Sequence, residues 1–382
     1  MHSKRAAAAC AVLSCGLAAA DADAAEFKVN DDLTFNAGFG LRTSFSRTDF
    51  AAPDGVSKST DFNVENARGF FSGSYANMFK GTFNFETANG ATTLLDGITQ
   101  LEFGPAANFW LGRMLPPTDR ANLYGPFFAL PWSFPGTAQN YPNIVAGRDN
   151  GATYWGKVFD NKLVYAIGAF KGHNKVLGLS GQTDKPAYFG RVSYSFWDAE
   201  PAPAYYTGGW YGGSKDILTV GLAGNRQKDG VGLAAAPGDL KIWSADFLLE
   251  KKFAGGVPTL EGAYYKYSLG ALDCGSGEPG APACLPGQNV GGQVDGKSYL
   301  VTAAWLFPQK LGVGQLQPYA RMQEFKRTVS ATTAKTYDLG MNYLIRGPNA
   351  RATLQLTKMT DDRIAAPKDS VKQLTVGVQL MF

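Results

Sequence analysis

Five arginines lie at alternating positions of candidate β-strands, and their spacing suggests the clearest chemistry in this sequence. Arg321, for example, stands between Ala320 and Met322. Because successive side chains of a strand point to opposite faces, each arginine falls on the face opposite its apolar neighbours. A guanidinium group offers forked N–H donors that suit a carboxylate or a phosphate. On one shared face, the five would form a ladder of positive charge for an oxyanion; they are Arg42, Arg68, Arg191, Arg321 and Arg351.

A second interpretation of these arginines is that they do not bind a solute. They could be solvated on a wet surface, or they could pair with acidic side chains on the same face, such as Asp246 and Asp338. Both interpretations are open from the sequence. The first is favoured by the known role of rings of like charge in selecting ions.

Catalytic chemistry has much weaker support. A hydrolase would normally use a histidine as its general base. Beyond the first residues the sequence has one histidine, His173, which lies in "FKGHNK" and is expected to be a solvated loop residue. No glycine-rich phosphate loop, metal-ligand cluster or serine-containing elbow accompanies it. We therefore expect no enzyme activity, no metal and no cofactor.

The elements that must position the arginines are β-strands. The last ten residues, "QLTVGVQLMF", alternate large apolar residues with small or polar ones, which is the period of a strand with one apolar face. No apolar run of about 18 residues follows the N-terminal segment, so a transmembrane helix is not expected. Sixteen segments have strand character: 32–46, 61–76, 80–88, 94–103, 107–114, 149–158, 162–170, 187–198, 215–227, 239–252, 257–268, 297–307, 314–326, 336–346, 350–360 and 371–382.

The connections between these segments fall into two alternating sets. One set is mostly short, with the seventeen-residue "AEPAPAYYTGGWYGGSK" as the exception. The other set is longer and polar, and it comprises 47–60, 115–148, 171–186, 228–238, 269–296 and 361–370. An even strand number with short turns at one end and long loops at the other is typical of an outer-membrane barrel. A soluble all-β protein could show the alternation, but it has no reason to show the loop asymmetry.

The N-terminal segment is interpreted as an export signal. Residues 1–24 have basic residues near the start, an apolar centre and a small-residue cleavage option at Ala22-Asp23-Ala24. A lipobox around Cys15 is a second option, although it would shorten the apolar centre. Residues 25–382 would then form the barrel domain. The net charge of +4 and the absence of basic runs argue against nucleic-acid binding.

Two cysteines remain after the leader, Cys274 and Cys284, in the turn-rich "DCGSGEPGAPACLPG". In an exported protein such a pair predicts a disulfide, which would pin the loop 269–296 on the long-loop, extracellular side. A metal site is the rival interpretation, but it lacks nearby histidines.

The segment 115–148 is the most unusual connection. Its 34 residues include six prolines and six aromatic residues but few charges, which suits burial better than solvation. We expect it to fold into the barrel and narrow the passage, although it could instead pack on the wall or latch a neighbouring subunit. Arg113, Arg120 and Arg148 should lie near the constriction, although Arg113 shares its parity with Phe109 and Leu111. The aromatic residues expected there include Tyr124, Phe127, Phe128 and Trp132.

Several segments resemble the phosphate-selective porin O and P family of outer-membrane anion porins. They are "VENARGFFSG" (64–73), "FWLGRMLPPTD" (109–119), "AGRDNGATYWGKVFDNKLVYAIGAFKG" (146–172), "LQPYARMQEF" (316–325) and "YDLGMNYLIRGPNARATLQL" (337–356). The resemblance implies a sixteen-stranded, trimeric, anion-preferring channel in the bacterial outer membrane. In the first motif only Arg68 matches a basic position of the family, and Asn66 stands at the other. This leaves open whether phosphate or small anions in general are preferred.

The sequence therefore predicts a transmembrane antiparallel β-barrel that conducts small solutes by passive diffusion. Its partners would be outer-membrane lipid, small anionic solutes and two further copies of the chain. The aromatic residues of 115–148 also suit small aromatic or organic carboxylates, which would use the arginines for charge and the rings for the body. A barrel adhesin or receptor with long extracellular loops is the other alternative.

Overall fold

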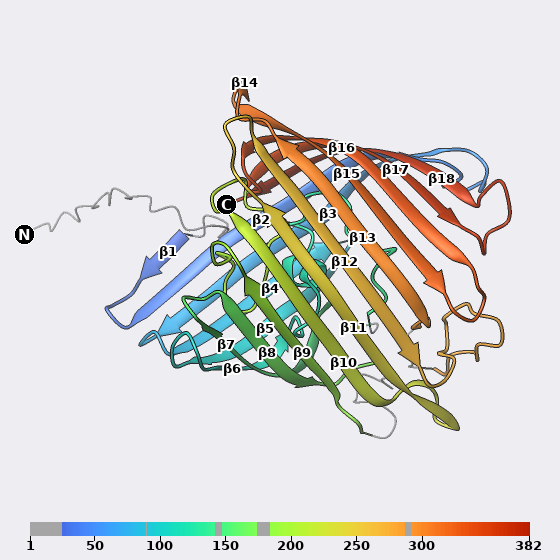
Figure 1. Cartoon of the computed structure of the whole chain (residues 1–382), viewed down its shortest axis with the longest axis horizontal. Coiled ribbons are helices and arrows are strands. Elements are labelled where there is room, and N and C mark those ends of the chain that lie inside the picture. Colours follow the sequence, from blue (N-terminus) through green and yellow to red (C-terminus); the bar gives the residue numbers. More distant parts are fainter. Residues whose placement is uncertain (1–24, 89, 142–146, 174–183, 287–291) are drawn as a thin grey trace, which may run out of the picture.

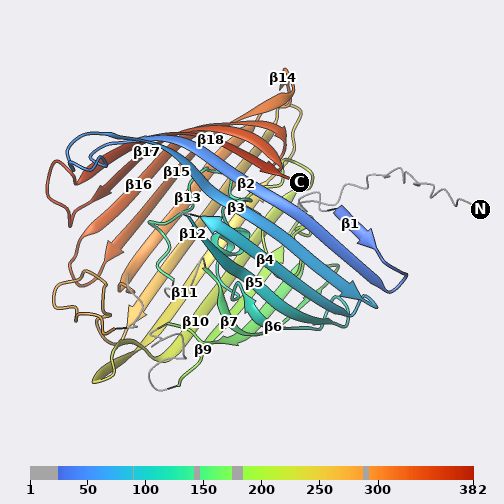
Figure 2. The ribbon, with the colours of Figure 1, turned by 180° about the vertical axis from the view of Figure 1, so that it is seen from behind.

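The structure, a computed structural model, describes residues 25–88, 90–141, 147–173, 184–286 and 292–382. In these residues sixteen long strands form one antiparallel sheet that closes on itself, because β18 pairs with β2 and β9 pairs with β10. Figures 1 and 2 show the resulting barrel from opposite sides. The predicted fold is confirmed. The predicted signal peptide, residues 1–24, lies outside the described residues.

The strand bounds agree with the sixteen predicted segments to within a few residues, except around β10 and β11. The strands are β1 (Ala25–Lys28), β2 (Leu33–Thr48), β3 (Ser59–Tyr75), β4 (Phe79–Ala88), β5 (Ala91–Glu102), β6 (Asn108–Met114), β7 (Asp149–Val158), β8 (Leu163–Phe170), β9 (Ala187–Ser195), β10 (Ile217–Leu233), β11 (Ala236–Glu250), β12 (Val257–Leu269), β13 (Gly296–Leu306), β14 (Lys310–Leu311), β15 (Gly314–Arg327), β16 (Thr333–Arg346), β17 (Ala350–Asp361) and β18 (Ser370–Met381).

The predicted long loop 228–238 is wrong. Residues of that segment extend β10 and β11 into a longer hairpin, with a register shift between Gln227 and Val231. Its Lys, Asp and Gly residues indicated a turn, but Val231 is fully buried and packs in a cluster with Leu240 and Ile242. This inward packing continues the ladder past the irregularity.

Two short strands were not predicted. β14 pairs with the start of β15 in a turn. β1 pairs with β2 on the edge that β18 also uses: Met381 lies opposite Gly40 and Ala25 lies opposite Ala37. The first and last strands of the described chain, β1 and β18, therefore pair with successive parts of the same edge of β2.

Exposure along the strands is the reverse of what a water-soluble protein shows. Leu339 is 63% exposed and its neighbour Asp338 is 3% exposed. The same alternation recurs in β10, where Leu222 is exposed and Asn225 is buried. Because large apolar side chains avoid water, a sheet with apolar outward residues and polar inward residues is typical of a barrel surrounded by lipid. Among the described residues, no helix is long and apolar enough to cross a membrane.

Candidate functional site

The segment 115–148, here named the inner loop, packs against inward-facing side chains of the wall. Arg351 of β17 donates hydrogen bonds to the carbonyl oxygens of Ala129 (2.8 Å) and Leu130 (3.1 Å). Ser298 of β13 donates to the carbonyl of Ala138 at 2.6 Å. These wall residues are buried on the face opposite the exposed apolar residues, so the described part of the inner loop lies on the inner side of the barrel wall. Its residues 142–146 lie outside the described ranges.

The inner loop contains a short helix, α1 (Arg120–Tyr124). Asp119 caps it, because its carboxylate accepts hydrogen bonds from the backbone N–H groups of Ala121 and Asn122. The same carboxylate accepts from the Tyr265 hydroxyl at 2.5 Å, which ties the helix start to β12. Burial raises the pKa of the Asp119 carboxyl above its ordinary value. Of the predicted aromatic residues, Tyr124, Phe127 and Trp132 are buried and Phe128 is half-buried.

A second inward segment, residues 196–216 between β9 and β10, meets the inner loop from the opposite end of the barrel. The Tyr205 hydroxyl donates to the carbonyl of Leu115 at 2.6 Å, and the Thr207 hydroxyl donates to the carbonyl of Arg120 at 2.9 Å. Tyr205 also packs with Trp110 and Trp155 of the wall. We name residues 196–216 the turn insert. The length of this connection is evident from the sequence but its burial was not predicted, although its aromatic residues give the same signal as those of the inner loop.

Charged groups join the inner loop, the turn insert and the wall. Arg120 contacts Glu200 at 2.5 Å, and Arg191 of β9 contacts Asp246 of β11 at 2.6 Å. The Arg120 backbone N–H also donates to Asp246. Burial alone would raise the pKa of Glu200, but the Arg120 guanidinium and the hydrogen bonds from Tyr211 and Thr219 together outweigh burial and lower that pKa below its ordinary value. The positive charges of Arg120 and Arg191 are therefore balanced locally.

Other inward arginines are also paired with acids. Arg68 contacts Glu86 at 2.5 Å, and Arg148 contacts Asp96 at 3.1 Å. Arg321 contacts Asp338 at 2.8 Å. The pairing of arginines with Asp246 and Asp338, which the sequence left as the alternative, is what the structure contains. Three of the five arginines, Arg68, Arg191 and Arg321, therefore have an acidic partner, and anion binding by the five stays a prediction.

Arg42 and Arg351 differ from the rest. Arg42 donates to Asn66 at 2.8 Å and to the carbonyl of Trp132, and its guanidinium lies 4.2 Å from the Trp132 ring centroid. Arg351 donates to inner-loop carbonyls and to the Gln379 side chain. Within the described ranges, neither arginine has an acidic partner at ion-pair distance. Their hydrogen-bond acceptors are all neutral groups.

The placement of Arg113 near the constriction is wrong. Arg113 lies on the outer side with the exposed residues Phe109 and Leu111, and it donates to Asn150 at 3.2 Å. Together with Leu94 and Leu111 it lines a hollow on the outer wall. Phe109, Leu111 and Arg113 occupy alternate positions of β6, so the three side chains lie on the same, outer face of the strand.

A cavity of about 640 Å³ lies between the inner loop and the wall formed by β2, β3, β4 and β18. Of the predicted site residues it brings together Arg42, Arg68, Arg148 and Trp132. Among the described residues its charged lining consists of these three arginines with Glu65 and Glu86. A smaller cavity of about 80 Å³ lies between the inner loop and the turn insert, lined by Leu123, Phe128, Tyr206, Trp210 and others.

Two loop predictions outside the barrel interior have different outcomes. The disulfide between Cys274 and Cys284 is present, so the predicted pairing is confirmed. His173, expected to be solvated, is 2% exposed, and its Nε2 lies 2.5 Å from a carboxylate oxygen of Asp273. The contact joins the start of the β8–β9 loop to the loop that contains the disulfide.

The barrel is similar in fold to solved outer-membrane proteins. An anion-selective porin from Comamonas acidovorans aligns over 92% of this chain and 100% of its own, with a TM-score of 0.60 at 14% identity. OmpF of Salmonella typhi, solved with daunomycin, aligns over 94% and 100%, with a TM-score of 0.60 at 12% identity. OmpT of Vibrio cholerae, solved in a trimer form, aligns over 92% and 100%, with a TM-score of 0.57 at 12% identity.

No protein-family model and no curated protein sequence matches the chain. Membership of the phosphate-selective porin O and P family therefore stays a prediction. The similarities to solved structures are all at low identity and concern the fold alone. The chain has a sixteen-stranded porin fold.

Proposed function

We propose that this protein is an outer-membrane channel through which small solutes diffuse passively. The observation that supports the proposal most is the combination of an apolar outer face with a 640 Å³ cavity lined by charged side chains on the inner face. The inner loop forms one side of that cavity, so it would set the width of the passage. The similarity to porins supports the same function. In this proposal residues 1–24 direct export.

We infer that the channel prefers anions to cations. Among the anions, we infer no particular preference for phosphate. The cavity is lined by three arginines and two glutamates among the described residues, and Arg42 is the arginine without an acidic partner there. Asn66 accepts a hydrogen bond from Arg42 where many relatives in the resembled family have a second basic residue. One uncompensated guanidinium attracts anions, but it gives a phosphate fewer charged donors than a cluster would.

The test is the reversal potential of the purified protein in a planar bilayer with a salt gradient. We expect the parent to favour chloride over potassium, and we expect Arg42→Gln to move the permeability ratio toward one. Arg226→Gln is the matched control, because Arg226 is exposed on the outer face and paired with Asp239 at 3.0 Å. Absence of conductance would reject the channel. Equal ratios for parent and Arg42→Gln would reject the role of Arg42.

Small aromatic carboxylates are a second candidate solute class. Arg42 lies over the Trp132 ring, and Arg68 lies 4.9 Å from the Phe127 ring centroid, so charge and aromatic surface occur together at the cavity. A carboxylate could exchange for the neutral acceptors of Arg42 while its ring stacks on these side chains. Benzoate should then reduce chloride conductance more strongly than acetate at equal concentration. Equal reduction by both would remove this candidate.

We also propose that the chain assembles as a homotrimer, as the solved OmpT trimer form suggests. Native mass spectrometry of the detergent-extracted protein should give a mass three times that of the mature chain. A monomer peak alone, under conditions that preserve conductance, would contradict the trimer.

The adhesin alternative predicts that the protein binds to a surface and does not conduct.

A further inference from the structure

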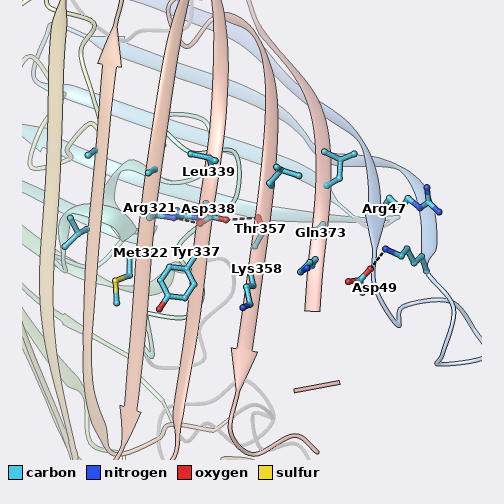
Figure 3. A pocket seen from close by; sticks show the side chains of 17 residues that line it. Arg47, Asp49, Arg321, Met322, Tyr337, Asp338, Leu339, Thr357, Lys358 and Gln373 are labelled. Carbon is cyan, nitrogen blue, oxygen red and sulfur yellow. Dashed lines mark hydrogen bonds and ion pairs between the residues drawn. The ribbon is translucent and has the colours of Figure 1, made fainter. Parts of the chain in front are cut away.

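The outer wall has a hollow of about 960 Å³ across β13, β15, β16, β17, β18 and β2 (Figure 3). Its apolar part includes the small residues Ala303 of β13 and Ala320 of β15, with Val301 and Met322 beside them on the same strands and larger residues on the following three strands. Leu339, Leu356 and Leu374 are cross-strand neighbours in one row. Small residues beside a row of leucines leave an elongated depression on a face that is otherwise apolar.

Basic residues line one end of this hollow. Lys358 of β17 lies directly opposite Lys372 of β18, and both point outward. Arg47 of β2 lies opposite Leu374, one step along the same face. Like charges directly opposite each other on adjacent strands destabilise a sheet. A negative charge beside the pair would offset this repulsion.

Among the described residues that line this end of the hollow, acids supply only part of that charge. Asp49 pairs with Lys58 at 2.8 Å and also attracts Lys372, so one carboxylate serves these two lysines while Arg47 and Lys358 line the same end. Arg321 and Asp338 also line the hollow, but they are paired with each other and add no net charge. In the described ranges no ion pair involves Arg47, Lys358 or Lys372. Elsewhere on the outer face, Arg226 lies opposite Lys241, and there Asp239 pairs with Arg226.

We propose that the hollow binds a lipid whose headgroup contains a phosphate monoester. The phosphate lies between Lys358 and Lys372 within reach of Arg47, and the acyl chains lie over Leu339, Leu356 and the alanines. This placement adds negative charge beside the two lysines and fills the depression with hydrocarbon at the same time. The inference rests on the proposed membrane location of the chain but not on its conductance.

The test uses native mass spectrometry of the full mature chain in neutral detergent, titrated with dioleoylphosphatidic acid, with dioleoylglycerol or with inorganic phosphate. We expect phosphatidic acid to bind and the other two to bind far more weakly. The double variant Lys358→Gln/Lys372→Gln should lose at least about tenfold in affinity, since each lysine near an anionic lipid contributes roughly fivefold. The control Lys326→Gln/Lys335→Gln, whose lysines both pair with Glu324, should bind like the parent.

Three results would overturn the site. They are equal affinity of parent and double variant, an equal loss in the control, and equal binding of dioleoylglycerol or inorganic phosphate. Lys358→Glu provides a second check, because it replaces the repulsive pair with an attractive one: it should unfold at higher urea concentration than the parent and should not bind phosphatidic acid. Conductance of the double variant should match the parent. A chain that conducts but binds no lipid contradicts this site alone, and a chain that binds lipid but does not conduct contradicts the channel alone.

Discussion

At the scale of single residues, an inward arginine has no fixed meaning until its acidic neighbour is known. Arg191, Arg321 and Arg68 each contact an acid at 2.8 Å or less, so their charges contribute to holding strands together rather than to the field in the cavity. Arg42 has a similar place in its strand, but its acceptors are an asparagine and a backbone carbonyl. Whether an arginine has an acidic partner depends on residues of another strand. The sequence next to the arginine does not show which residues those are.

The Arg191–Asp246 pair makes this distinction testable. Both side chains are buried, and Asp246 loses its closest cation in Arg191→Gln. Breaking a buried pair from one side costs about 3–5 kcal/mol when it leaves a buried charge without a partner, and Arg120, 3.6 Å from Asp246, keeps the expected cost at the lower end of that range. We expect urea unfolding in lipid vesicles to shift by that amount, with a partial return in Arg191→Gln/Asp246→Asn. The reversal potential should change less than in Arg42→Gln. A large change in reversal potential without loss of stability would instead restore the charge-ladder interpretation.

At the scale of elements, the sequence predicts strands well because a wall with apolar and polar faces imposes a period of two. The final strand, β18, shows this from Leu374 to Leu380, and its bounds are correct to about one residue. The hairpin at 228–238 was missed because glycine and charged residues within a bulge look like a turn. The inner loop was identified by its aromatic residues and prolines, yet its contacts with β12, β13 and β15–β18 require the closed barrel.

The candidate site was predictable to the same degree. The face of Arg42, Arg68, Arg191, Arg321 and Arg351 followed from parity, whereas Arg113 was expected near the constriction despite the parity that it shares with Phe109 and Leu111. The turn insert was missed as an element of the interior because a connection at the short-turn end is expected to be exposed. The ion pairs Arg120–Glu200 and Arg148–Asp96 join residues 80 and 52 positions apart, and no local pattern links such residues.

The turn insert gives a prediction at this scale. Tyr205 is buried between the wall and the inner loop, so Tyr205→Ala removes a ring and its hydrogen bond to Leu115. We expect a larger single-channel conductance and faster entry of larger sugars in liposome swelling, because the interior opens at the insert. Tyr188→Ala is the control, since Tyr188 is 61% exposed on the outer wall. Unchanged conductance in Tyr205→Ala would mean that the insert does not border the passage.

At the scale of the whole molecule, the outer face determines which solvent the barrel can occupy. Exposed leucine, valine and phenylalanine side chains recur around the barrel, and the basic residues Arg47, Lys358 and Lys372 lie near the strand ends at the long-loop side. An apolar band with charged residues toward its edge matches the profile of a bilayer, whose centre excludes charge and whose surface tolerates it. The cost of a charge should therefore depend on its position along a strand.

That dependence distinguishes a membrane barrel from a soluble one. Leu354 lies near the middle of β17 and Leu311 lies in β14 at a turn, and both are exposed on the outside. In lipid, Leu354→Lys should lower the free energy of unfolding by about 2–4 kcal/mol, whereas Leu311→Lys near the interface should cost about 0–1 kcal/mol. In water the two exposed leucines would tolerate lysine equally. Urea titrations of both variants in vesicles measure the difference, and equal small effects would contradict a membrane location of the barrel.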